Sequence, residues 1–461
     1  MALPRGADSG TGFAGLDASV GGVTTDAALL WIGGAPNKPV VVSWRGGDAS
    51  GLTRATLSPL GSTHVSLGGL RPNTPYEVTI KAGRRKTITH FRSAPLGTDR
   101  TPLHFVFSGD LAGQNACRDA ASGFPIFDVM HAQRASLFIG LGDMIYADGD
   151  CASVGPFNNA QVQRDDEPLR DTTSFIKHWR YNYADPAFQR LRHSLIYEPV
   201  WDDHEIVNDF GPATARTADA PQVDLLAPGR EAFVASNPVA PPSAAPEQLY
   251  RRFRYGAHAE FFLLDTRQYR DHNELTDTGV LPKSLLGAQQ RRWLIDGLRN
   301  STATWKFIVS SVPISIPTGW PVEKGRDGWA SGDGDDGFER ELYAIFDALA
   351  VANVDRLVWL SADVHFATGF ELHPLPHQPD FVVTELIVGP LSAGIFPTDA
   401  MDTTFSPTRL FYHAPEKEPA TLDEALSFYN FGDISIDPQG ALTFTLVNGH
   451  GETVVERTLT K

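Results

Sequence analysis

Four short apolar runs of the chain each end in acidic or histidine residues. These residues are Asp110 after the run 104–107, Asp143 after 137–141, and the segments WDDHE at 201–205 and SADVH at 361–365. An apolar run of about five residues that ends in a carboxylate is typical of a buried strand that carries a ligand at its carboxyl end, where open α/β sheets build their sites. Four such strands that meet at one rim predict a metal centre.

Length and composition limit the classes of protein to consider. A chain of 461 residues exceeds what one core usually holds, so two domains are expected. The sequence has no apolar run of about twenty residues, and we therefore expect no membrane span. The net charge of -16 argues against general nucleic-acid binding, which needs clustered Lys and Arg. A small anionic substrate remains compatible, because bound metal ions outweigh the local protein charge.

The chain is expected to contain two folded parts. Residues 1–15 are rich in Gly, Ala and Asp and should be disordered or weakly attached. Short β-rich runs separated by turns predict a small β-sandwich over 16–96, and 97–102 reads as a polar linker. From 103 to 461, strand and helix patterns alternate, which predicts an α/β (α+β) domain with mixed sheets flanked by helices. A loop at 319–337, with Trp320 and Trp329, should help to shape the substrate pocket.

The ligand types indicate which metals fit. Asp143 can use both carboxylate oxygens and is the natural bridge between two cations, with Asp110 and Asp203 beside it. Tyr146 is an unusual ligand whose phenolate suits Fe³⁺. Asp363 and His365 are two residues apart, so one can face each metal. Oxygen donors with a single clear histidine favour iron, manganese, magnesium or calcium over a zinc pair.

Such a pair of cations suits displacement at phosphorus, in which one ion acidifies a bound water and both hold the phosphoryl oxygens. His204 could then reach the phosphoryl oxygen or the leaving group as a general acid or electrostatic partner. Glu205 either orients that imidazole or caps a helix. Phosphate-binding Gly-Lys-Ser loops and Gly-x-Ser-x-Gly elbows are missing from the sequence, so nucleotide triphosphatase and serine hydrolase functions have no support.

Two cysteines, Cys117 and Cys151, lie seven and eight residues after Asp110 and Asp143. The matched offset puts both on loops that leave neighbouring strand ends, where a disulfide is geometrically feasible. Two reduced, buried thiols are the alternative in a cytosolic protein.

At these residues the chain resembles the PhoD-like alkaline phosphatase and phosphodiesterase family of the calcineurin-like metallophosphoesterases. The matching blocks are GDMIYAD at 142–148, WDDHE at 201–205, LDTRQYR at 264–270, ADVH at 362–365 and GPLSAG at 389–394. The resemblance implies a sandwich of two mixed β-sheets flanked by helices from about 103 nearly to the C-terminus. A preceding β-sandwich is typical of the family, and LRPNTPY at 70–76 resembles a segment of fibronectin type III domains.

The resemblance also implies a ligand set. Iron would be held by Asp110, Asp143, Tyr146 and His365. One or two divalent ions, most often Ca²⁺, would be held by Asp143, Asp203 and Asp363, and Asn208 could join them. Mn²⁺, Mg²⁺ and Zn²⁺ remain alternatives. Asp110 departs from many PhoD-like members, which have a cysteine there, and resembles the ligand blocks of purple acid phosphatases.

The expected function is metal-dependent hydrolysis of phosphate monoesters, diesters or both, through attack of a metal-activated hydroxide on a small phosphate ester. Arg267 and Arg270 could clamp a phosphate, or could instead pair with Asp265 or Asp271. The alternatives are a phospholipase-D-like or phosphotriester hydrolase, and a non-catalytic binding protein with a structural metal site. Exported relatives imply periplasmic or extracellular residence; a cytoplasmic location and the oligomeric state are left open.

Overall fold

The computed structural model describes residues 13, 15–164, 168–216, 222–319, 326–330 and 337–460. Its first strands are β1 (Asp17–Gly21), β2 (Ala27–Gly33), β3 (Pro39–Gly46), β4 (Ala49–Thr56), β5 (Ser62–Gly68), β6 (Pro75–Ala82), β7 (Arg85–Arg92), β8 (Leu103–Ser108), β9 (Leu137–Leu141) and β10 (Ile196–Val200). The later strands are β11 (Arg251–Tyr255), β12 (Ala259–Leu263), β13 (Trp305–Val309), β14 (Leu357–Ser361), β15 (Ala367–Leu372), β16 (Val383–Ile387), β17 (Pro407–His413), β18 (Asn430–Ile436), β19 (Leu442–Asn448) and β20 (Thr453–Leu459). The helices are α1 (Ile126–Ala132), α2 (Thr172–Tyr183), α3 (Pro186–Arg192), α4 (Leu226–Ser236), α5 (Gly287–Asn300), α6 (Glu339–Val351) and α7 (Leu422–Leu426).

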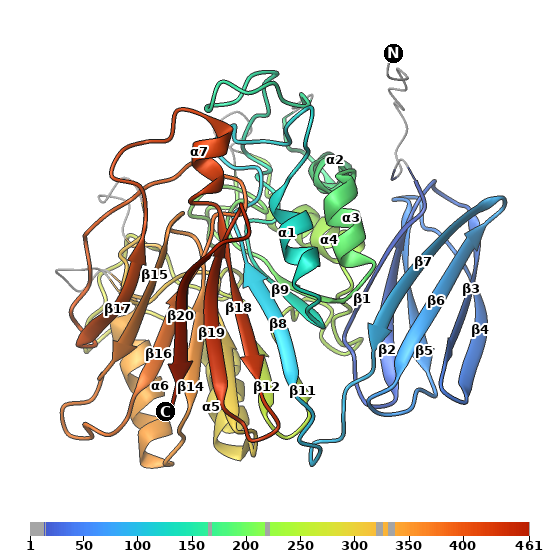
Figure 1. The fold of residues 1–461 in the computed structure, drawn as a ribbon. Coiled ribbons are helices and arrows are strands. Elements are labelled where there is room, and N and C mark those ends of the chain that lie inside the picture. Colours follow the sequence, from blue (N-terminus) through green and yellow to red (C-terminus); the bar gives the residue numbers. More distant parts are fainter. Residues whose placement is uncertain are drawn as a thin grey trace.

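Two large mixed sheets form the body of the molecule (Figure 1). The nine-stranded sheet has the order β20-β19-β18-β8-β9-β10-β1-β2-β5, and the seven-stranded sheet has the order β11-β12-β13-β14-β16-β15-β17. A third sheet has four strands in the order β4-β3-β6-β7. The predicted layered fold of two mixed sheets with flanking helices is confirmed.

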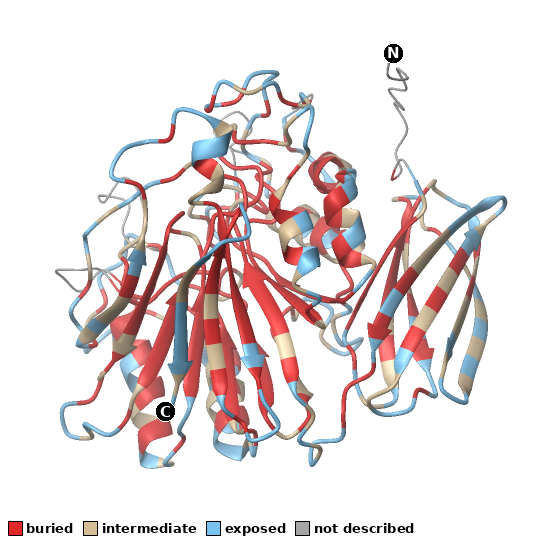
Figure 2. Cartoon of the chain, in the orientation of Figure 1, coloured by how far each residue is buried: buried red, intermediate tan, exposed pale blue. Residues whose placement is uncertain are grey.

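The main core lies between the two large sheets. Phe105 of β8 packs edge-on against Phe261 of β12 and Phe307 of β13, with ring centroids 5.1 Å apart in both pairs. Because β8, β9, β12, β13 and β14 are covered on both faces, their sequences are nearly continuous apolar runs, and Figure 2 shows these strands as buried.

Helices cover the outer faces of both sheets. On the nine-stranded sheet, Phe127 of α1 stacks on Phe188 of α3 at 4.1 Å, and both belong to the core that includes Phe138 of β9. On the seven-stranded sheet, α5 and α6 bury apolar side chains such as Leu294 and Phe346 in the core that includes Phe262 and Trp359. Within the described residues, none of the helices is long and apolar enough to cross a membrane.

The N-terminal strands form a sandwich that fits the predicted fibronectin type III-like arrangement. Strands β1, β2 and β5 face the four-stranded sheet across one core, which includes Val42 and Val78. The Tyr76 hydroxyl accepts the N–H of Arg71 at 2.7 Å, which closes the loop before β6 in the way of a tyrosine corner.

The sandwich is joined to the rest of the chain within one sheet. Strand β1 pairs in parallel with β10, with Val20 opposite Ile196. Residues 1–15 were expected to be weakly attached, and among them the structure describes Phe13 and Gly15. Phe13 is buried, and its ring centroid lies 5.0 Å from that of Trp31.

Candidate metal centre

The carboxyl ends of four strands meet at one rim and deliver the predicted acidic residues. β8, β9 and β10 are parallel neighbours, and β14 lies in the facing sheet. Asp110 follows β8, Asp143 follows β9, Asp203 follows β10 and Asp363 follows β14. All four side chains are buried.

The backbone turns sharply where it presents these ligands. Asp110, Asp143, Asp363 and His365 all have positive φ angles, of 62°, 50°, 74° and 62°. Non-glycine residues adopt this left-handed region rarely, and when they do they cluster at functional sites. The strained turns aim side chains from separate strands at a shared point.

The first cluster joins three predicted iron ligands. One ligand atom each from Asp110, Asp143 and His365 lie within 4.8 Å of one another. The Tyr146 hydroxyl lies 2.8 Å from Nε2 of His365. Nδ1 of His365 lies 2.6 Å from the carbonyl oxygen of Gly394, an outer contact that orients the ring and leaves Nε2 for a metal.

The second cluster shares Asp143 with the first. Ligand atoms of Asp143, Asp203 and His204 lie within 4.8 Å of one another, as do those of Asp202, Asp203 and Asp363. Asp143 therefore belongs to both clusters, which fits its predicted bridging role.

Buried carboxylate oxygens without hydrogen-bond partners indicate that this site suits cations. Within the described part of the chain, Oδ2 of Asp110, of Asp143 and of Asp363 has no partner. Leaving such a charged acceptor unsatisfied is costly. Burial, together with the nearby carboxylates, raises the pKa of each of these three residues well above its usual range. The donor set of hard oxygens and one imidazole fits iron and a divalent cation such as calcium.

His204 lies beside both clusters in a defined orientation. Its Nδ1 is 2.6 Å from Oδ1 of Asp148, and its ring stacks on Tyr146 at 4.1 Å. Burial lowers the pKa of His204, but the carboxylates of Asp148 and Asp203 outweigh burial and raise it to about 10. Because the carboxylate of Asp148 can only accept, Nδ1–H of His204 is the donor in this hydrogen bond.

Glu205 holds together the turns that carry the acidic residues of the clusters. This differs from both predicted roles, which were to orient the imidazole of His204 or to cap a helix. Its carboxylate accepts the backbone N–H groups of Asp143 at 3.0 Å, Met144 at 2.8 Å and Asp202 at 2.7 Å. One side chain thus ties the turn after β9 to the turn after β10.

Arg267 and Arg270 contact buried carboxylates. Arg267 donates to Asp202 at 2.6 Å and to both oxygens of Asp327 at 2.8 and 2.6 Å. Arg270 donates to the Asp327 carboxylate and, at 2.8 Å, to its carbonyl oxygen. Arg267 is fully buried, so its geometry favours the structural alternative. Its guanidinium pairs with Asp202 and Asp327, whereas Asp265 accepts the backbone N–H of Arg267 at 3.1 Å.

Asn208 lies at the rim. Its backbone N–H donates to Oδ2 of Asp148 at 2.7 Å, and its exposed side chain lines a cavity of about 510 Å³ that also contacts Arg270. Its predicted role as a metal ligand stays a prediction.

Sequence reasoning missed Asp148, Asp202 and Asp327. Asp148 is the last residue of the matching block at 142–148, and its spacing from Tyr146 was the available signal. Asp327 lies in the loop 319–337, of which the structure describes 319, 326–330 and 337; Trp320 is outside the described residues. The sequence carries no signal for its pairing with Arg267, 60 residues away.

Comparisons with known proteins agree with this geometry. The model of the PhoD-like phosphatase family matches residues 105–443. The chain is 25% identical over 391 residues to alkaline phosphatase D of Bacillus subtilis (strain 168), a match that covers 78% of this chain and 65% of that protein. The chain thus spans slightly less than two thirds of that relative.

Solved structures share the fold. A structure of PhoD superposes with a TM-score of 0.74 at 19% identity, over 99% of this chain and 90% of that chain. A purple acid phosphatase from yellow lupin (Lupinus luteus) seeds gives a TM-score of 0.63 at 12% identity, over 96% of this chain and 74% of that one. Because the family model covers most of the chain and the strand ends gather the metal-type ligands, the chain belongs to the PhoD-like phosphatase family.

Proposed function

We propose that this protein is a metal-dependent hydrolase of phosphate mono- or diesters. The observation that carries the proposal is the convergence of three buried carboxylate oxygens without hydrogen-bond partners beside a histidine that is held by Asp148. The family and the curated relative support a phosphoric ester hydrolase.

Asp110, Asp143, Tyr146 and His365 would hold Fe³⁺, and Asp143, Asp203 and Asp363 would hold Ca²⁺. When bound, the cations supply positive charge for the phosphoryl oxygens and acidify a water. His204, held by Asp148, donates a proton or a hydrogen bond to the phosphoryl oxygen or the leaving group. Arg267 and Asp327 keep Asp202 in place beneath the cluster.

The test is the initial rate on p-nitrophenyl phosphate and bis-p-nitrophenyl phosphate from neutral to alkaline pH, with metal-replete protein. We expect turnover of at least one ester and its loss in Asp143→Asn. The control is Asp347→Asn, an exposed carboxylate on α6 that pairs with His377. A faster diester makes the protein a phosphodiesterase, and a faster monoester makes it a phosphatase. Absence of turnover in folded, metal-loaded protein contradicts the proposal and favours a triesterase or a binding protein.

Metal analysis of the isolated protein tests the ions. We expect iron and calcium, both reduced in Asp143→Asn; stoichiometric zinc contradicts the assignment. The disulfide between Cys117 and Cys151 supports periplasmic or extracellular residence, and fractionation of the native host tests it.

A further inference from the structure

The outer face of the four-stranded sheet is strongly basic. Along β6 and β7, residues such as Val78, Ile80 and Phe91 point into the sandwich core, so the alternate residues point outward. The exposed basic residues on this outward side, here called the basic face, are Arg45, Arg54, Lys81, Lys86, His90 and Arg92.

Like charges oppose one another across the strands of the basic face. Lys81 of β6 is directly opposite Lys86 of β7, and Val41 of β3 separates Lys81 from Arg54 of β4. Like charges directly opposite each other destabilise a sheet. Glu77 is the acidic residue on this face, and it pairs with Arg45 at 3.0 Å and with His90 at 3.9 Å. Lys81 and Lys86 thus keep a repulsive arrangement that an anionic ligand would relieve.

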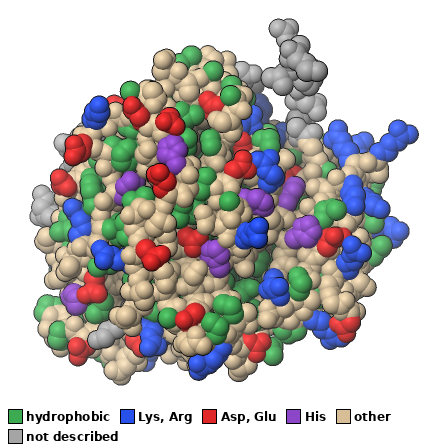
Figure 3. Space-filling model, viewed as in Figure 1, with side chains coloured by type: hydrophobic (Ala, Val, Ile, Leu, Met, Phe, Trp, Pro, Cys, Tyr) green, Lys and Arg blue, Asp and Glu red, His purple; other side chains and the backbone are tan. Residues whose placement is uncertain are grey.

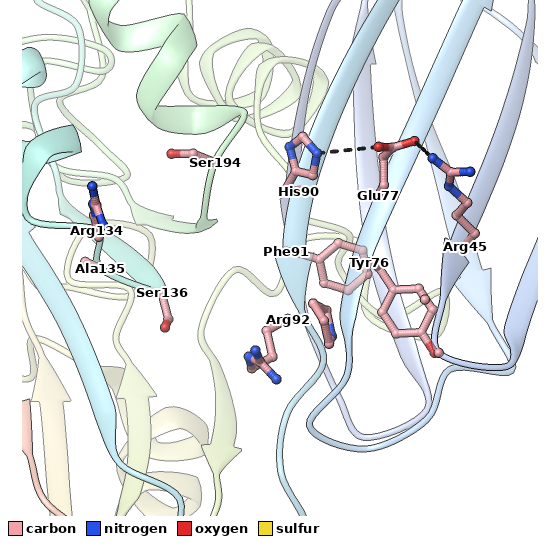
Figure 4. Close-up of a pocket in the computed structure, with 13 residues that line it drawn as sticks. Arg45, Tyr76, Glu77, His90, Phe91, Arg92, Arg134, Ala135, Ser136 and Ser194 are labelled. Carbon is pink, nitrogen blue, oxygen red and sulfur yellow. Dashed lines mark hydrogen bonds and ion pairs between the residues drawn. The ribbon is translucent and has the colours of Figure 1, made fainter.

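A cavity continues the basic face toward the body of the molecule. It has a volume of about 600 Å³ and lies between β6 and β7 on one side and the loops before β9 and β10 on the other. Arg45, His90 and Arg92 line it from the sandwich, and Arg134 lines it from the facing wall (Figure 4). A second cavity of about 520 Å³ adjoins it and shares Arg134, Ala135 and Ser194, and the two cavities together are here called the groove.

This groove is separate from the metal centre. Arg134 and Ser136 precede β9, whereas Asp143 follows it. The groove therefore lies at the amino end of a strand whose carboxyl end carries the metal ligands, about 17 Å away along five residues.

The charge of the sandwich contrasts with that of the whole chain. Residues 17–92 contain nine of the 39 Lys and Arg but four of the 55 Asp and Glu. Figure 3 shows Lys and Arg gathered over the sandwich, at the right of the view. The net charge of -16 therefore belongs to the rest of the chain.

We propose that the basic face and its groove bind a linear polyanion through the charges of its backbone. A row of cations that leads into a groove suits a chain-like ligand and does not suit a flat membrane. Single-stranded nucleic acids are usually held by aromatic side chains that stack on bases. The outward residues of β3, β4, β6 and β7, all of them described, include no Phe, Tyr or Trp. Tyr76 and Phe91 line the groove, but their side chains are buried in the sandwich core and present no open ring for a base to stack on. The site therefore suits a polymer recognised without bases.

The test is binding of fluorescent inorganic polyphosphate to the full chain, titrated at several salt concentrations. Lys81→Ala/Lys86→Ala should weaken binding about tenfold and make the slope of log affinity against log salt shallower by about 2. Arg292→Ala/Arg299→Ala is the matched control, because it removes the same charge from exposed positions of α5, outside the sandwich and the groove, and should bind as the wild type does.

Lys81→Glu separates binding from folding. It replaces a like-charge pair with an opposite-charge pair, so its melting temperature should stay equal or rise while its affinity for polyphosphate falls. Hydrolysis of p-nitrophenyl phosphate should not change in any of these variants, so this proposal and the proposed function fail independently. Equal binding by Lys81→Ala/Lys86→Ala, absence of polyphosphate binding, or tighter binding to oligo-dT or phosphatidylglycerol vesicles would overturn the proposal.

Discussion

Single residues outside the metal cluster set the orientation of the groups that would act on a substrate. Asp148 is the main example, because its two oxygens hold both the imidazole of His204 and the backbone N–H of Asn208. The orientation of His204, and with it the proposed catalytic role, therefore depends on a carboxylate that is absent from the metal clusters of the described residues.

Replacing Asp148 with Asn should reduce kcat and leave the metal content and the KM nearly unchanged. The loss should be about tenfold or more, since a well-held general acid contributes roughly 10²–10⁴. Steady-state kinetics with elemental analysis measure both effects. Asp150→Asn, an exposed carboxylate in the same loop, is the control; an equal loss there, or loss of metal in Asp148→Asn, contradicts the assignment.

Glu385 of β16 gives a pH dependence of stability away from the metal centre. Burial raises its pKa to about 7, although the N–H groups of Ile314 and Ser315 donate to it at 2.6 and 3.1 Å. Between about pH 4.5 and 7 the folded protein binds a proton at Glu385 that the unfolded chain has lost. The contribution of Glu385 to stability is therefore greatest below about pH 4.5 and falls as the pH rises to about 7.

Glu385→Gln should remove this dependence. The unfolding free energy of the variant minus that of the wild type should rise by up to about 3 kcal/mol between pH 4.5 and 7, and then stay level. Urea unfolding at a series of pH values measures the difference. A difference that is constant with pH would show that Glu385 is ionised in the folded protein.

At the scale of elements, the loops that leave β8 and β9 are tied together. The disulfide between Cys117 and Cys151 closes a segment with a sequence separation of 34, which contains α1, β9, Asp143 and Tyr146. The bond restricts the conformations of the unfolded chain between residues 117 and 151, the segment that contains Asp143.

Cys117→Ala/Cys151→Ala should lower the unfolding free energy by about 3–4 kcal/mol in the chain-entropy model. Urea denaturation checks this value. Wild-type protein in a strong reductant should lose the same amount, and a reductant effect that persists in the double variant would point to another cause.

Strand ends could be predicted from the sequence, whereas the contacts between them could not. An apolar run followed by Asp143 or Asp363 is a local pattern, so the strands and the acidic residues at their carboxyl ends were predicted correctly. The roles of these residues as metal ligands stay predictions. The brace by Glu205 and the burial of Arg267 against Asp327 join residues about 60 positions apart. Local periodicity carries no information about such pairs. The sequence alone therefore leaves a phosphate-binding role for Arg267 open beside the structural one.

At the scale of the whole molecule, a buried ion pair holds the sandwich to the body. Asp17 of β1 accepts from Arg192 at 2.5 Å and lies 2.8 Å from Nε2 of His193. The Arg192 guanidinium also lies 3.8 Å from the ring centre of Tyr183. The two predicted parts of the chain thus share a core contact as well as the pairing of β1 with β10, which no local pattern around residue 96 indicates.

Arg192→Met should lower the unfolding free energy by about 3–5 kcal/mol, because it leaves Asp17 buried without its main partner. Asp17→Asn/Arg192→Met should recover part of the loss, since no buried charge is then left without a partner. Calorimetry should give one transition for the wild type. Two separate transitions, or no recovery in the double variant, would contradict this coupling.

The pairing of β1 with β10 has a consequence for how this chain can be shortened. A fragment that begins at residue 97 would lose the pairing of Val20 with Ile196 and would uncover the β1 side of β10, a five-residue strand that is buried throughout. Exposed apolar strands of this kind recruit other chains and aggregate. The sandwich therefore covers an edge of the nine-stranded sheet, and a shortened chain without it would expose that edge.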